Sequence, residues 1–582
     1  MESHQIGKAA IKRWGRVLSS ILLFPVLYLL FVLIADFRAN IPLLAAMEQF
    51  SSEVFILSLF PLATLRGRYP TTLELADMGI GHYVVMTVTV LAWWIVTSNL
   101  LRVGWKLTRS WLNPLPRRPK RIGFGLAIGI AILWLMLPVL PSSDSAQIRV
   151  DITQVVGPMP QHQRGFSQGG EVKMREPGYF EDAMERLSEL HPQFVRIDHI
   201  YDYYNVYTID TDGTPRYNWV ELDRVIDAIC SSGAEPFISV SYTPPALAQN
   251  TIYDLPTDLA AWEELVFQTV YHLNIERGLN IRYWEIWNEP NLSGFWVGTL
   301  EEYLALYQAT ARGALRADPS VHIGGPATSS RQDARTALLF VTERPWIIEL
   351  ARYTQRNELP LDFVSWHLYD PTPANYLRNV ATHQSWVAEL NPPPELFLTE
   401  WNWTGGRASA FDNGGTIAYL AATLATLADS SLDQAFFFEP VDGATGWDGF
   451  WGIMRADGAV KPTYRAFQLL SELSGDRLLT QNTHAHVGGL ATREGNEVNI
   501  LLWNYTGNPT PAEVVIVGLP VNSEILANIY GVAAEPGNSF YETGANDLRI
   551  GIAPLVLTRA GQRQLTVHMP PNSIRLIQFP IP

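Results

Sequence analysis

The chain has 582 residues, which is enough for more than one folded domain, and 47% of them are hydrophobic. Its formal net charge of −15 at pH 7 opposes a general attraction to nucleic acid, so we expect no nucleic-acid partner. The sequence contains neither a metal-spaced cluster of histidine and cysteine nor a glycine-rich phosphate loop, and we therefore expect no metal and no cofactor.

The first quarter of the chain is very apolar. Three of its segments, residues 17–36, 82–101 and 122–141, have about the 20 residues that a helix needs to cross a bilayer. Lysine and arginine precede the first segment and fill the loop between the second and third, which predicts that both regions are cytoplasmic. Residues 1–147 are therefore predicted to be a multi-pass anchor in the lipid bilayer of the cell membrane. Everything after Pro141 is expected on the extracytoplasmic side.

Residues 43–65 form a further apolar segment. Glu48 and Glu53 within it would be costly at the centre of a bilayer, so we interpret it as an interfacial helix. A fourth span at this place is the alternative, and it would put the rest of the chain on the cytoplasmic side.

From residue 148 onward, strand-like apolar runs alternate with helix-like segments, which is typical of a parallel sheet covered by helices. The eight expected strands are Val150–Val156, Phe194–Asp198, Glu235–Ser241, Tyr283–Trp287, His322–Gly325, Phe363–Trp366, Leu396–Thr399 and Gln434–Phe438. Eight such units predict an α/β fold, a (β/α)8 TIM barrel over residues 148–472. From residue 473 to 582, short alternating strands divided by Gly, Pro and Asn predict an antiparallel β-sandwich.

Two carboxylates end apolar strands abruptly. Glu289 closes the fourth strand within Trp-Asn-Glu-Pro-Asn, and Glu400 closes the seventh within Thr-Glu-Trp. Reactive groups of a TIM barrel project from the carboxyl ends of its strands, and strands four and seven face each other. Either glutamate alone is more simply a surface or ion-paired side chain, but the Asn-Glu-Pro context and the second glutamate favour a catalytic pair. Glycoside hydrolysis with retention needs such a pair, about 5 to 5.5 Å apart.

These residues resemble clan A of the glycoside hydrolases, and the wider pattern is similar to family 39, which includes β-xylosidases and α-L-iduronidases. The similar segments spread over residues 148–582 and include Phe194–His199, Trp284–Asn291, His322–Pro326, Ser365–Tyr369 and Lys461–Phe467. The resemblance implies that Glu289 is the acid/base and Glu400 the nucleophile. It also implies that Asn288 hydrogen-bonds the sugar hydroxyl next to the anomeric carbon.

Two residues of the sixth strand are candidate pocket residues. His367 and Tyr369 are two positions apart, so their side chains share one face of the strand. We expect Tyr369 to donate a hydrogen bond to Glu400 and His367 to line the pocket wall. A buried tyrosine and a core histidine are the alternative interpretation.

The second strand supplies two more candidates, Arg196 and His199, which we place among the substrate-binding residues. The guanidinium of Arg196 is expected either to hold Glu400 ionised or to pair with Glu285, whose position in its strand points it into the barrel.

Aromatic side chains bind the apolar faces of sugars, and Trp401 and Trp403 are the expected stacking residues. The eighth strand ends in a glutamate, Glu439, where this clan commonly has a tryptophan. Trp447 or Trp451 is then the candidate to replace that tryptophan. Glu439 itself either contacts substrate or forms a structural ion pair.

The sequence therefore predicts a retaining O-glycosyl hydrolase that acts on cell-surface or extracellular polysaccharide or oligosaccharide by double displacement. One alternative is a catalytically silent, membrane-anchored receptor that binds carbohydrate, although the presence of both glutamates opposes it. The other is a transglycosylase that uses the same carboxylate pair, which only product analysis with added acceptors would distinguish.

Overall fold

The computed structural model describes residues 145–582, apart from residues 171, 331–343, 404–413, 444–450, 522–523, 534–547 and 560. The three predicted membrane spans and the segment 43–65 lie outside the described residues. Within the described part of the chain, no helix is both long enough and apolar enough to cross a membrane.

Eight parallel strands close into a barrel in the order β10-β11-β2-β3-β6-β7-β8-β9. Their bounds are β2 Gly165–Gln168, β3 Phe194–Ile197, β6 Glu235–Val240, β7 Tyr283–Ile286, β8 His322–Ser329, β9 Phe363–Tyr369, β10 Glu395–Asn402 and β11 Gln434–Phe438. The predicted eight-stranded parallel barrel is thus confirmed.

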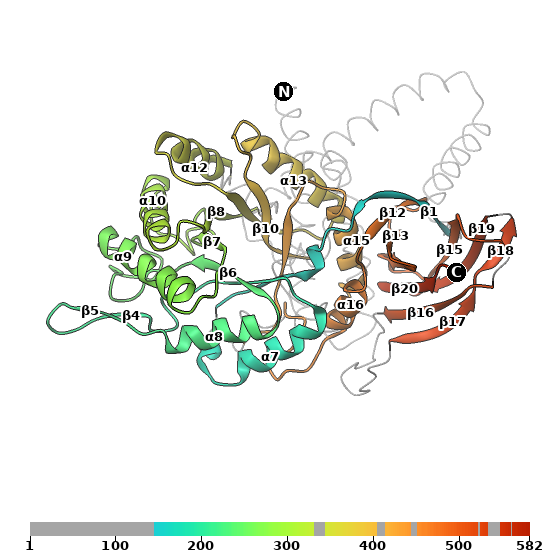
Figure 1. Ribbon diagram of the computed structural model, residues 1–582, viewed down its shortest axis with the longest axis horizontal. Helices are drawn as coiled ribbons and strands as arrows, with labels where there is room; N and C mark the ends of the chain where they lie inside the picture. The colour runs from blue at the N-terminus through green and yellow to red at the C-terminus, as the bar shows by residue number, and fades with distance from the viewer. Residues whose placement is uncertain are drawn as a thin grey trace, which may run out of the picture. The chain divides into compact units, whose positions relative to one another are not determined.

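Helices follow the barrel strands and cover their outer side (Figure 1). They are α7 Tyr179–Leu187, α8 Val220–Ser231, α9 Leu259–Val270, α10 Leu300–Ala317, α12 Arg344–Arg356, α13 Pro373–Val387, α15 Ile417–Leu427 and α16 Pro462–Leu470, and a π-helical turn at Tyr271–Glu276 extends α9. Local sequence determines where α10 begins. The Thr299 hydroxyl accepts a hydrogen bond from the N–H of Glu302, whose carboxylate accepts one from the N–H of Thr299, and α10 begins at this capping box.

The amino-terminal end of the barrel is filled by a separate aromatic cluster. Its members stand at or near the beginning of their strands: Phe194, Phe237, Tyr283, Phe363, Phe397 and Phe436. Because aromatic rings close this end, polar side chains can gather only in the middle of the barrel and at its carboxyl end. A small hairpin of β4 (Tyr207–Ile209) and β5 (Pro215–Tyr217) projects from the barrel between β3 and α8 (Figure 1).

The remaining strands form a ten-stranded sheet in the order β17-β16-β20-β14-β13-β12-β1-β15-β19-β18. Their bounds are β1 Ala146–Pro158, β12 Asp476–Asn482, β13 Val487–Glu494, β14 Glu497–Asn504, β15 Thr510–Val517, β16 Leu526–Ala533, β17 Arg549–Pro554, β18 Val556–Arg559, β19 Gln562–Met569 and β20 Ser573–Pro580. The pairing is antiparallel except between β1 and β15. Helices α15 and α16 lie between the barrel and this sheet (Figure 1).

The prediction that Val150–Val156 is the first barrel strand is wrong. This segment belongs to β1, which pairs with β12 and β15 of the ten-stranded sheet. Ile148, Val150 and Ile152 alternate along β1 and are buried in the core of that sheet. The true first barrel strand, β2, has only four residues, and two of them are the polar Ser167 and Gln168. It therefore carries no apolar run that would announce it in the sequence.

Candidate active site

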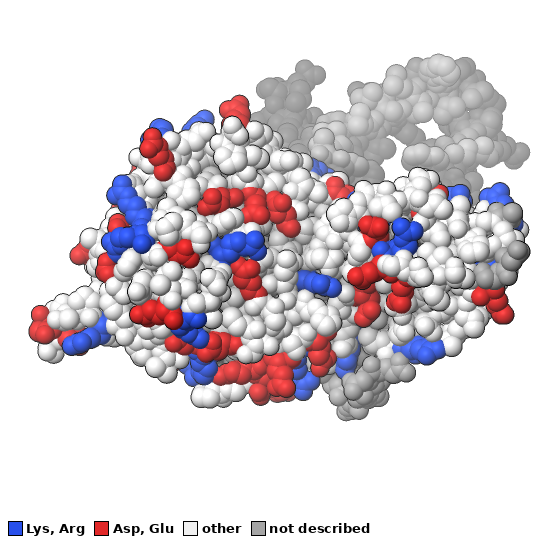
Figure 2. All heavy atoms as spheres, viewed as in Figure 1, with Lys and Arg blue, Asp and Glu red and all other residues white. Residues whose placement is uncertain are grey.

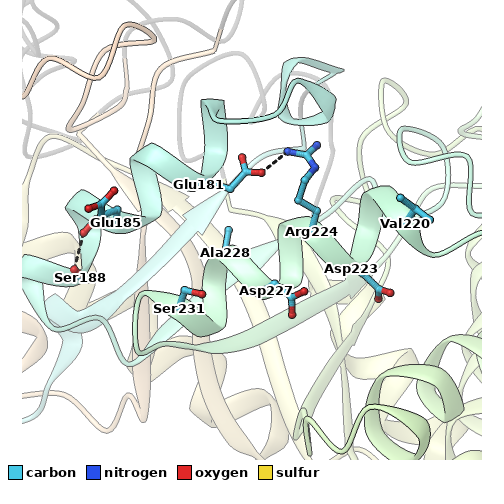
Figure 3. A pocket seen from close by; sticks show the side chains of 9 residues that line it. All are labelled: Glu181, Glu185, Ser188, Val220, Asp223, Arg224, Asp227, Ala228 and Ser231. Atoms are coloured by element: carbon cyan, nitrogen blue, oxygen red, sulfur yellow. Dashed lines mark hydrogen bonds and ion pairs between the residues drawn. The ribbon is translucent and has the colours of Figure 1, made fainter.

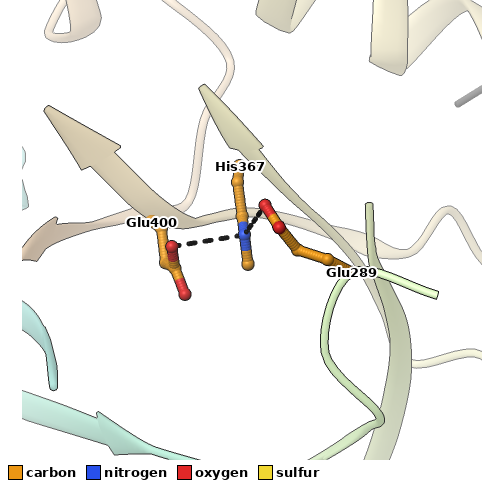
Figure 4. Close-up of side chains that lie close together, drawn as sticks. All are labelled: Glu289, His367 and Glu400. Carbon is orange, nitrogen blue, oxygen red and sulfur yellow. Dashed lines mark hydrogen bonds and ion pairs between the residues drawn. The ribbon is translucent and has the colours of Figure 1, made fainter. Parts of the chain in front are cut away.

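Three side chains predicted from the sequence meet at the carboxyl end of the barrel (Figure 4). Glu289 follows β7, His367 lies on β9 and Glu400 lies on β10. The Nδ1 atom of His367 is 3.0 Å from Oε1 of Glu289 and 3.4 Å from Oε2 of Glu400. One oxygen of each glutamate and a ring nitrogen of His367 all lie within 4.8 Å of one another. The carboxylates are nearly buried, since Glu289 is 8% and Glu400 is 6% exposed.

An unusual backbone turn aims Glu289 into the site. Trp287 and Glu289 have positive φ angles of 71° and 46°, which side chains other than glycine rarely adopt. The N–H of Glu289 donates to the carbonyl of Ala327 at the end of β8, at 3.0 Å. Strained backbone of this kind persists where the surroundings enforce it and is frequent at functional sites.

Arg196 of β3 connects the two glutamate-bearing strands from inside the barrel. Its fully buried guanidinium donates to Glu285 at 2.6 Å, to Glu400 at 3.1 Å and to the side-chain oxygen of Asn288 at 2.8 Å. Burial opposes its charge, but Glu285 and Glu400 outweigh burial and raise the pKa of Arg196. Arg196 therefore contacts both of the partners considered from the sequence, Glu285 and Glu400. One side chain can do this because a guanidinium offers five donors in a rigid fork.

Replacing Arg196 by methionine tests this centre. The change leaves the fully buried Glu285 without its cation, so we expect the free energy of unfolding to fall by about 3 to 5 kcal/mol. Adding Glu285→Gln should restore part of the stability, because it removes the orphaned charge, yet hydrolysis should stay impaired because Glu400 still lacks Arg196. Chemical denaturation and kcat/KM measure the two effects. Recovery of activity along with stability in the double variant would contradict a role of Arg196 at Glu400.

The nucleophile candidate sits beside a break in the strand ladder. The register of β9 and β10 shifts between Leu398 and Glu400, so that Glu400 is opposite His367. A bulge of this kind re-aims a side chain. The predicted hydrogen bond from the Tyr369 hydroxyl to Oε2 of Glu400 is present, at 2.6 Å. Burial, followed by the charge of Glu400, raises the pKa of Tyr369 well above its ordinary value, so the phenol keeps its proton and remains a donor.

Opposing effects act on Glu400 itself. Burial, with a contribution from the nearby Glu289, outweighs His367, Arg196 and Tyr369, which each favour the ionised form, so the pKa of Glu400 is raised above its ordinary value. The Tyr369 hydroxyl donates a hydrogen bond to Glu400 and thereby stabilises its ionised form. Loss of this hydrogen bond should raise the pKa of Glu400 further.

The variant Tyr369→Phe therefore has a predicted pH signature. If Glu400 acts ionised, the acid limb of the pH profile of kcat/KM should move to higher pH by about one unit, because a hydrogen bond to a charged group contributes about 1.5 to 3 kcal/mol. The ring is kept, so thermal stability should change little. An acid limb that stays in place would separate Tyr369 from the ionisation of Glu400.

Opposing effects also act on the pKa of His367. Burial opposes protonation of its imidazole, but Glu400 and Glu289 outweigh it and raise the pKa of His367. These three groups also have the spacing of a metal site. The two carboxylates thus favour the protonated imidazole, which can donate a hydrogen bond from Nδ1.

The other predicted substrate-binding residues lie around this centre. Asn288 donates to the hydroxyl of Tyr242 at 2.8 Å and is held by Arg196 on its other side. His199 stacks on Tyr203, with ring centroids 4.1 Å apart, and its Nδ1 is 2.7 Å from a carboxylate oxygen of Asp202. Both Asn288 and His199 are thus fixed in place before any ligand binds.

The two tryptophans expected to stack on sugar differ. Trp401 is fully buried and packs edge-on against Tyr376 and Phe437 in the layer between barrel and helices. The prediction that Trp401 faces a ligand is therefore wrong, because neighbouring residues on a strand face opposite sides and Glu400 faces the barrel interior. Trp403 is only half-buried, and its indole N–H donates to the hydroxyl of Tyr505 at 3.0 Å.

The end of the eighth strand brings further residues near the site. Trp451 packs against Tyr369 and Phe438, with ring centroids 5.8 and 5.2 Å apart. It therefore lies beside the active centre, as expected of a residue that replaces the tryptophan common at the end of the eighth strand. Trp447 lies outside the described residues. Glu439 is 1% exposed and accepts a hydrogen bond from Gln168 at 3.0 Å.

Sequence reasoning missed Tyr242 and the residues of β2. Tyr242 lies two residues after the end of β6, so a search for polar side chains just beyond every strand end would have found it. Ser167 and Gln168 contact Arg196 and Glu439 from a strand too short to recognise. Their signal is weak because four residues carry no periodicity.

A surface groove lies away from these residues. Figure 2 shows acidic side chains gathered over helices α7 and α8, and between these helices is a groove of about 700 Å³ (Figure 3). Its acidic lining is largely neutralised. Glu181 pairs with Arg224 at 2.7 Å, and Asp223 and Asp227 both pair with Arg277. The groove is therefore a surface of the helix layer with no catalytic arrangement.

A closed (β/α)8 barrel with two neighbouring glutamates at the carboxyl ends of its strands fits the chemistry of an O-glycosyl hydrolase, and comparison with known proteins shows this class. Residues 150–393 match the family model described as Glycosyl hydrolases family 39. The match includes Glu289 and ends before Glu400. The chain is a glycoside hydrolase, and its barrel is similar to family 39.

Individual relatives support the same class. The chain is 27% identical over 376 residues to a β-xylosidase of Caldicellulosiruptor saccharolyticus, covering 57% of this chain and 74% of the relative. It is 28% identical over 362 residues to a β-xylosidase of Geobacillus stearothermophilus, covering 55% and 68%. The solved structure of the GH39 enzyme from Xanthomonas axonopodis pv. citri superposes with a TM-score of 0.63 at 21% identity, covering 75% of this chain and 97% of that one. The last comparison shows a shared fold.

Proposed function

We propose that this chain is a retaining glycosidase of the family 39 type, with Glu289 as acid/base and Glu400 as nucleophile. The observation that carries the proposal is the closeness of the two glutamates at the carboxyl end of the barrel, where one carboxylate oxygen of each lies within 4.8 Å of one of the other, beside His367. Inverting enzymes keep their carboxyl groups about 6.5 to 9.5 Å apart to admit a water molecule between acid and base, whereas retaining enzymes bring them to about 5 to 5.5 Å.

The residues then act in two steps. A carboxylate oxygen of Glu400 bonds to the anomeric carbon while the glycosidic bond breaks, and Glu289 gives its proton to the leaving oxygen. Water next attacks the same carbon, Glu289 takes a proton from it, and the ester bond to Glu400 breaks. Arg196 and Tyr369 hold the Glu400 oxygens in place and stabilise the charge that returns to them in the second step.

The substrate that we propose is a neutral β-linked sugar, with a β-xyloside as first choice because both curated relatives are β-xylosidases. The charges of the described site agree. Glu285, Glu289, Glu400 and Glu439 are all buried there, and the guanidinium of Arg196 is already engaged by two carboxylates. A uronic acid would bring a further negative charge into this field at a cost. Arg407, the candidate partner for such a group, lies outside the described residues.

We further propose that the N-terminal segments anchor the enzyme in the membrane, with the barrel on the extracytoplasmic side. The support is the sequence pattern alone: three apolar segments of spanning length and the lysines and arginines that flank them. Carbonate-washed membranes of cells that express the full chain should retain it, and protease added to spheroplasts should degrade the barrel. A barrel that resists protease until the cells are lysed would place it on the cytoplasmic side.

The test of the catalytic proposal is covalent trapping. The full-length protein is incubated with 2-deoxy-2-fluoro glycosyl fluorides of β-xylose, β-glucose and α-L-iduronate, followed by intact mass and peptide mapping. An adduct on Glu400 would support retention and the nucleophile together, and the sugar that labels fastest would name the glycone. Adducts elsewhere, or turnover with inverted configuration, would overturn the proposal.

Two alternatives remain distinguishable in the same experiments. A transglycosylase would label in the same way, but it would form longer glycosides when sugar acceptors are added, where a hydrolase releases free sugar. A silent receptor would bind oligosaccharide without labelling, and the buried, hydrogen-bonded pair of glutamates speaks against it.

A further inference from the structure

One residue of the C-terminal sheet reaches the rim of the active site. Tyr505 directly follows β14, and its hydroxyl accepts a hydrogen bond from the indole N–H of Trp403 at 3.0 Å. The same hydroxyl donates to the carbonyl of Pro371 at 3.0 Å. Trp403 follows Glu400 by three positions, and Pro371 follows Tyr369 by two. A single phenol thus joins the segments that continue from the nucleophile and from its hydrogen-bond donor.

The ends of β9 and β10 are joined by a second phenol as well, because the hydroxyl of Tyr376 lies 3.1 and 3.0 Å from the carbonyls of Leu368 and Asn402. The ladder between β9 and β10 is irregular beside Glu400, and its last paired residues are Tyr369 and Asn402. Beyond that pair, the N–H of Asp370 donates to the carbonyl of Asn402 at 3.3 Å. Among the described residues, the phenol of Tyr505 therefore continues the joining of the two strands beyond the last pair of their ladder.

The loop that carries Tyr505 is itself held firmly. The buried side-chain amide of Asn504 donates to the carbonyls of Asn508, Met569 and Pro570, at 2.8 to 3.0 Å. The N–H of Tyr505 donates to the carbonyl of His486 at 2.8 Å, and its ring packs near Tyr419 of α15, with centroids 6.1 Å apart. The phenol thus has a fixed position relative to the barrel rim before any substrate arrives.

We propose that Tyr505 is a positioning residue by which the C-terminal sheet sets the geometry of the hydrogen bond between Tyr369 and Glu400. The proposal rests on the proposed role of Glu400 and adds a second domain to the catalytic apparatus. Tyr505 acts through the ends of β9 and β10 and does not touch the reacting atoms. The ten-stranded sheet is then a part of the active site's support.

The decisive variant is Tyr505→Phe, which removes both hydrogen bonds and keeps the ring against Tyr419. With 4-nitrophenyl β-xyloside we expect kcat/KM to fall by about 10-fold, since small misplacements of reacting groups have large effects on rate. The acid limb of the pH profile should move to higher pH, in the same direction as for Tyr369→Phe but less far. A merely structural residue would lower thermal stability without moving this limb.

A matched control breaks another contact between the sheet and the barrel. Arg477 of β12 pairs with Asp429, which follows α15 near the amino-terminal end of the barrel, at 2.8 Å. Arg477→Gln should leave both the rate and the pH profile unchanged. If it changes them as Tyr505→Phe does, the effect reflects general loosening of the domain contact and the proposal fails.

The route of the effect is tested by a double variant. If Tyr505 acts through Tyr369, then Tyr505→Phe in a Tyr369→Phe background should add no further shift of the acid limb, whereas independent effects would add. Additive shifts, or a wild-type rate and profile in the single variant, would overturn the inference. A wild-type enzyme that neither hydrolyses the xyloside nor labels with any of the fluorinated sugars would instead refute the proposed function, so the two failures are distinct.

Discussion

The variant Glu400→Gly is expected to lower kcat/KM by about 10⁴-fold or more on every glycoside, because it removes the group proposed to attack the anomeric carbon. Arg196 keeps its partner Glu285 in this variant, so the fold should persist. The small side chain leaves room for azide, which should restore cleavage of an aryl glycoside and form a glycosyl azide. That azide should have the opposite anomeric configuration to the substrate, because it attacks from the side that Glu400 vacates. Kinetics with added azide and NMR of the product measure both effects.

The variant Glu289→Ala should have a different signature. Substrates with poor leaving groups should lose about 10² to 10⁴-fold in kcat/KM, because proton donation to the leaving oxygen is lost. An aryl glycoside with an acidic phenol should lose far less in the first step, since its leaving group needs no proton. Azide should then react with the glycosyl intermediate on Glu400 and give a glycosyl azide of retained configuration.

The two variants check each other. If azide gives the retained product with Glu400→Gly and the inverted product with Glu289→Ala, the roles of the two glutamates are exchanged. If neither variant loses more than a few-fold in activity, the pair beside His367 is not the catalytic pair. Comparing unfolding temperatures of both variants with the wild type ensures that a lost rate is not a lost fold.

The hydrogen-bond network around Glu400 shows why a carboxylate is tolerated in so buried a place. Arg196 and Tyr369 each donate to one of its oxygens, and His367 lies within 3.4 Å of the second. A buried charge is stable only where it is paired and hydrogen-bonded. The same donors hold the oxygens in fixed directions, which is the condition for attack on a bound sugar.

Some of this architecture follows from local sequence. A glutamate that follows an apolar strand can be recognised in the sequence, and this feature pointed to Glu289 and Glu400. Seven of the eight barrel strands were also predicted correctly from their apolar runs. The alternation of a strand also determines that Trp401 and Glu400 face opposite sides, and applying it would have excluded Trp401 as a stacking residue.

Other features depend on contacts between residues far apart in the chain. β1 has the apolar alternation of a barrel strand, and only its burial against β12 and β15 assigns it to the other sheet. Arg196 had two possible partners in the sequence, and its position inside the closed barrel brings it to both.

The sequence by itself predicted the parallel barrel, the two glutamates and the hydrogen bond from Tyr369, because hydrophobic periodicity, the residues at strand ends and the resemblance to a known family are all visible in it. The tertiary structure alone decided the short strand β2, the turn that aims Glu289 and the contact of Tyr505 with Trp403, which lies 102 residues away in the chain. Such features arise from side-chain packing and hydrogen bonds across the fold, and no local pattern records them.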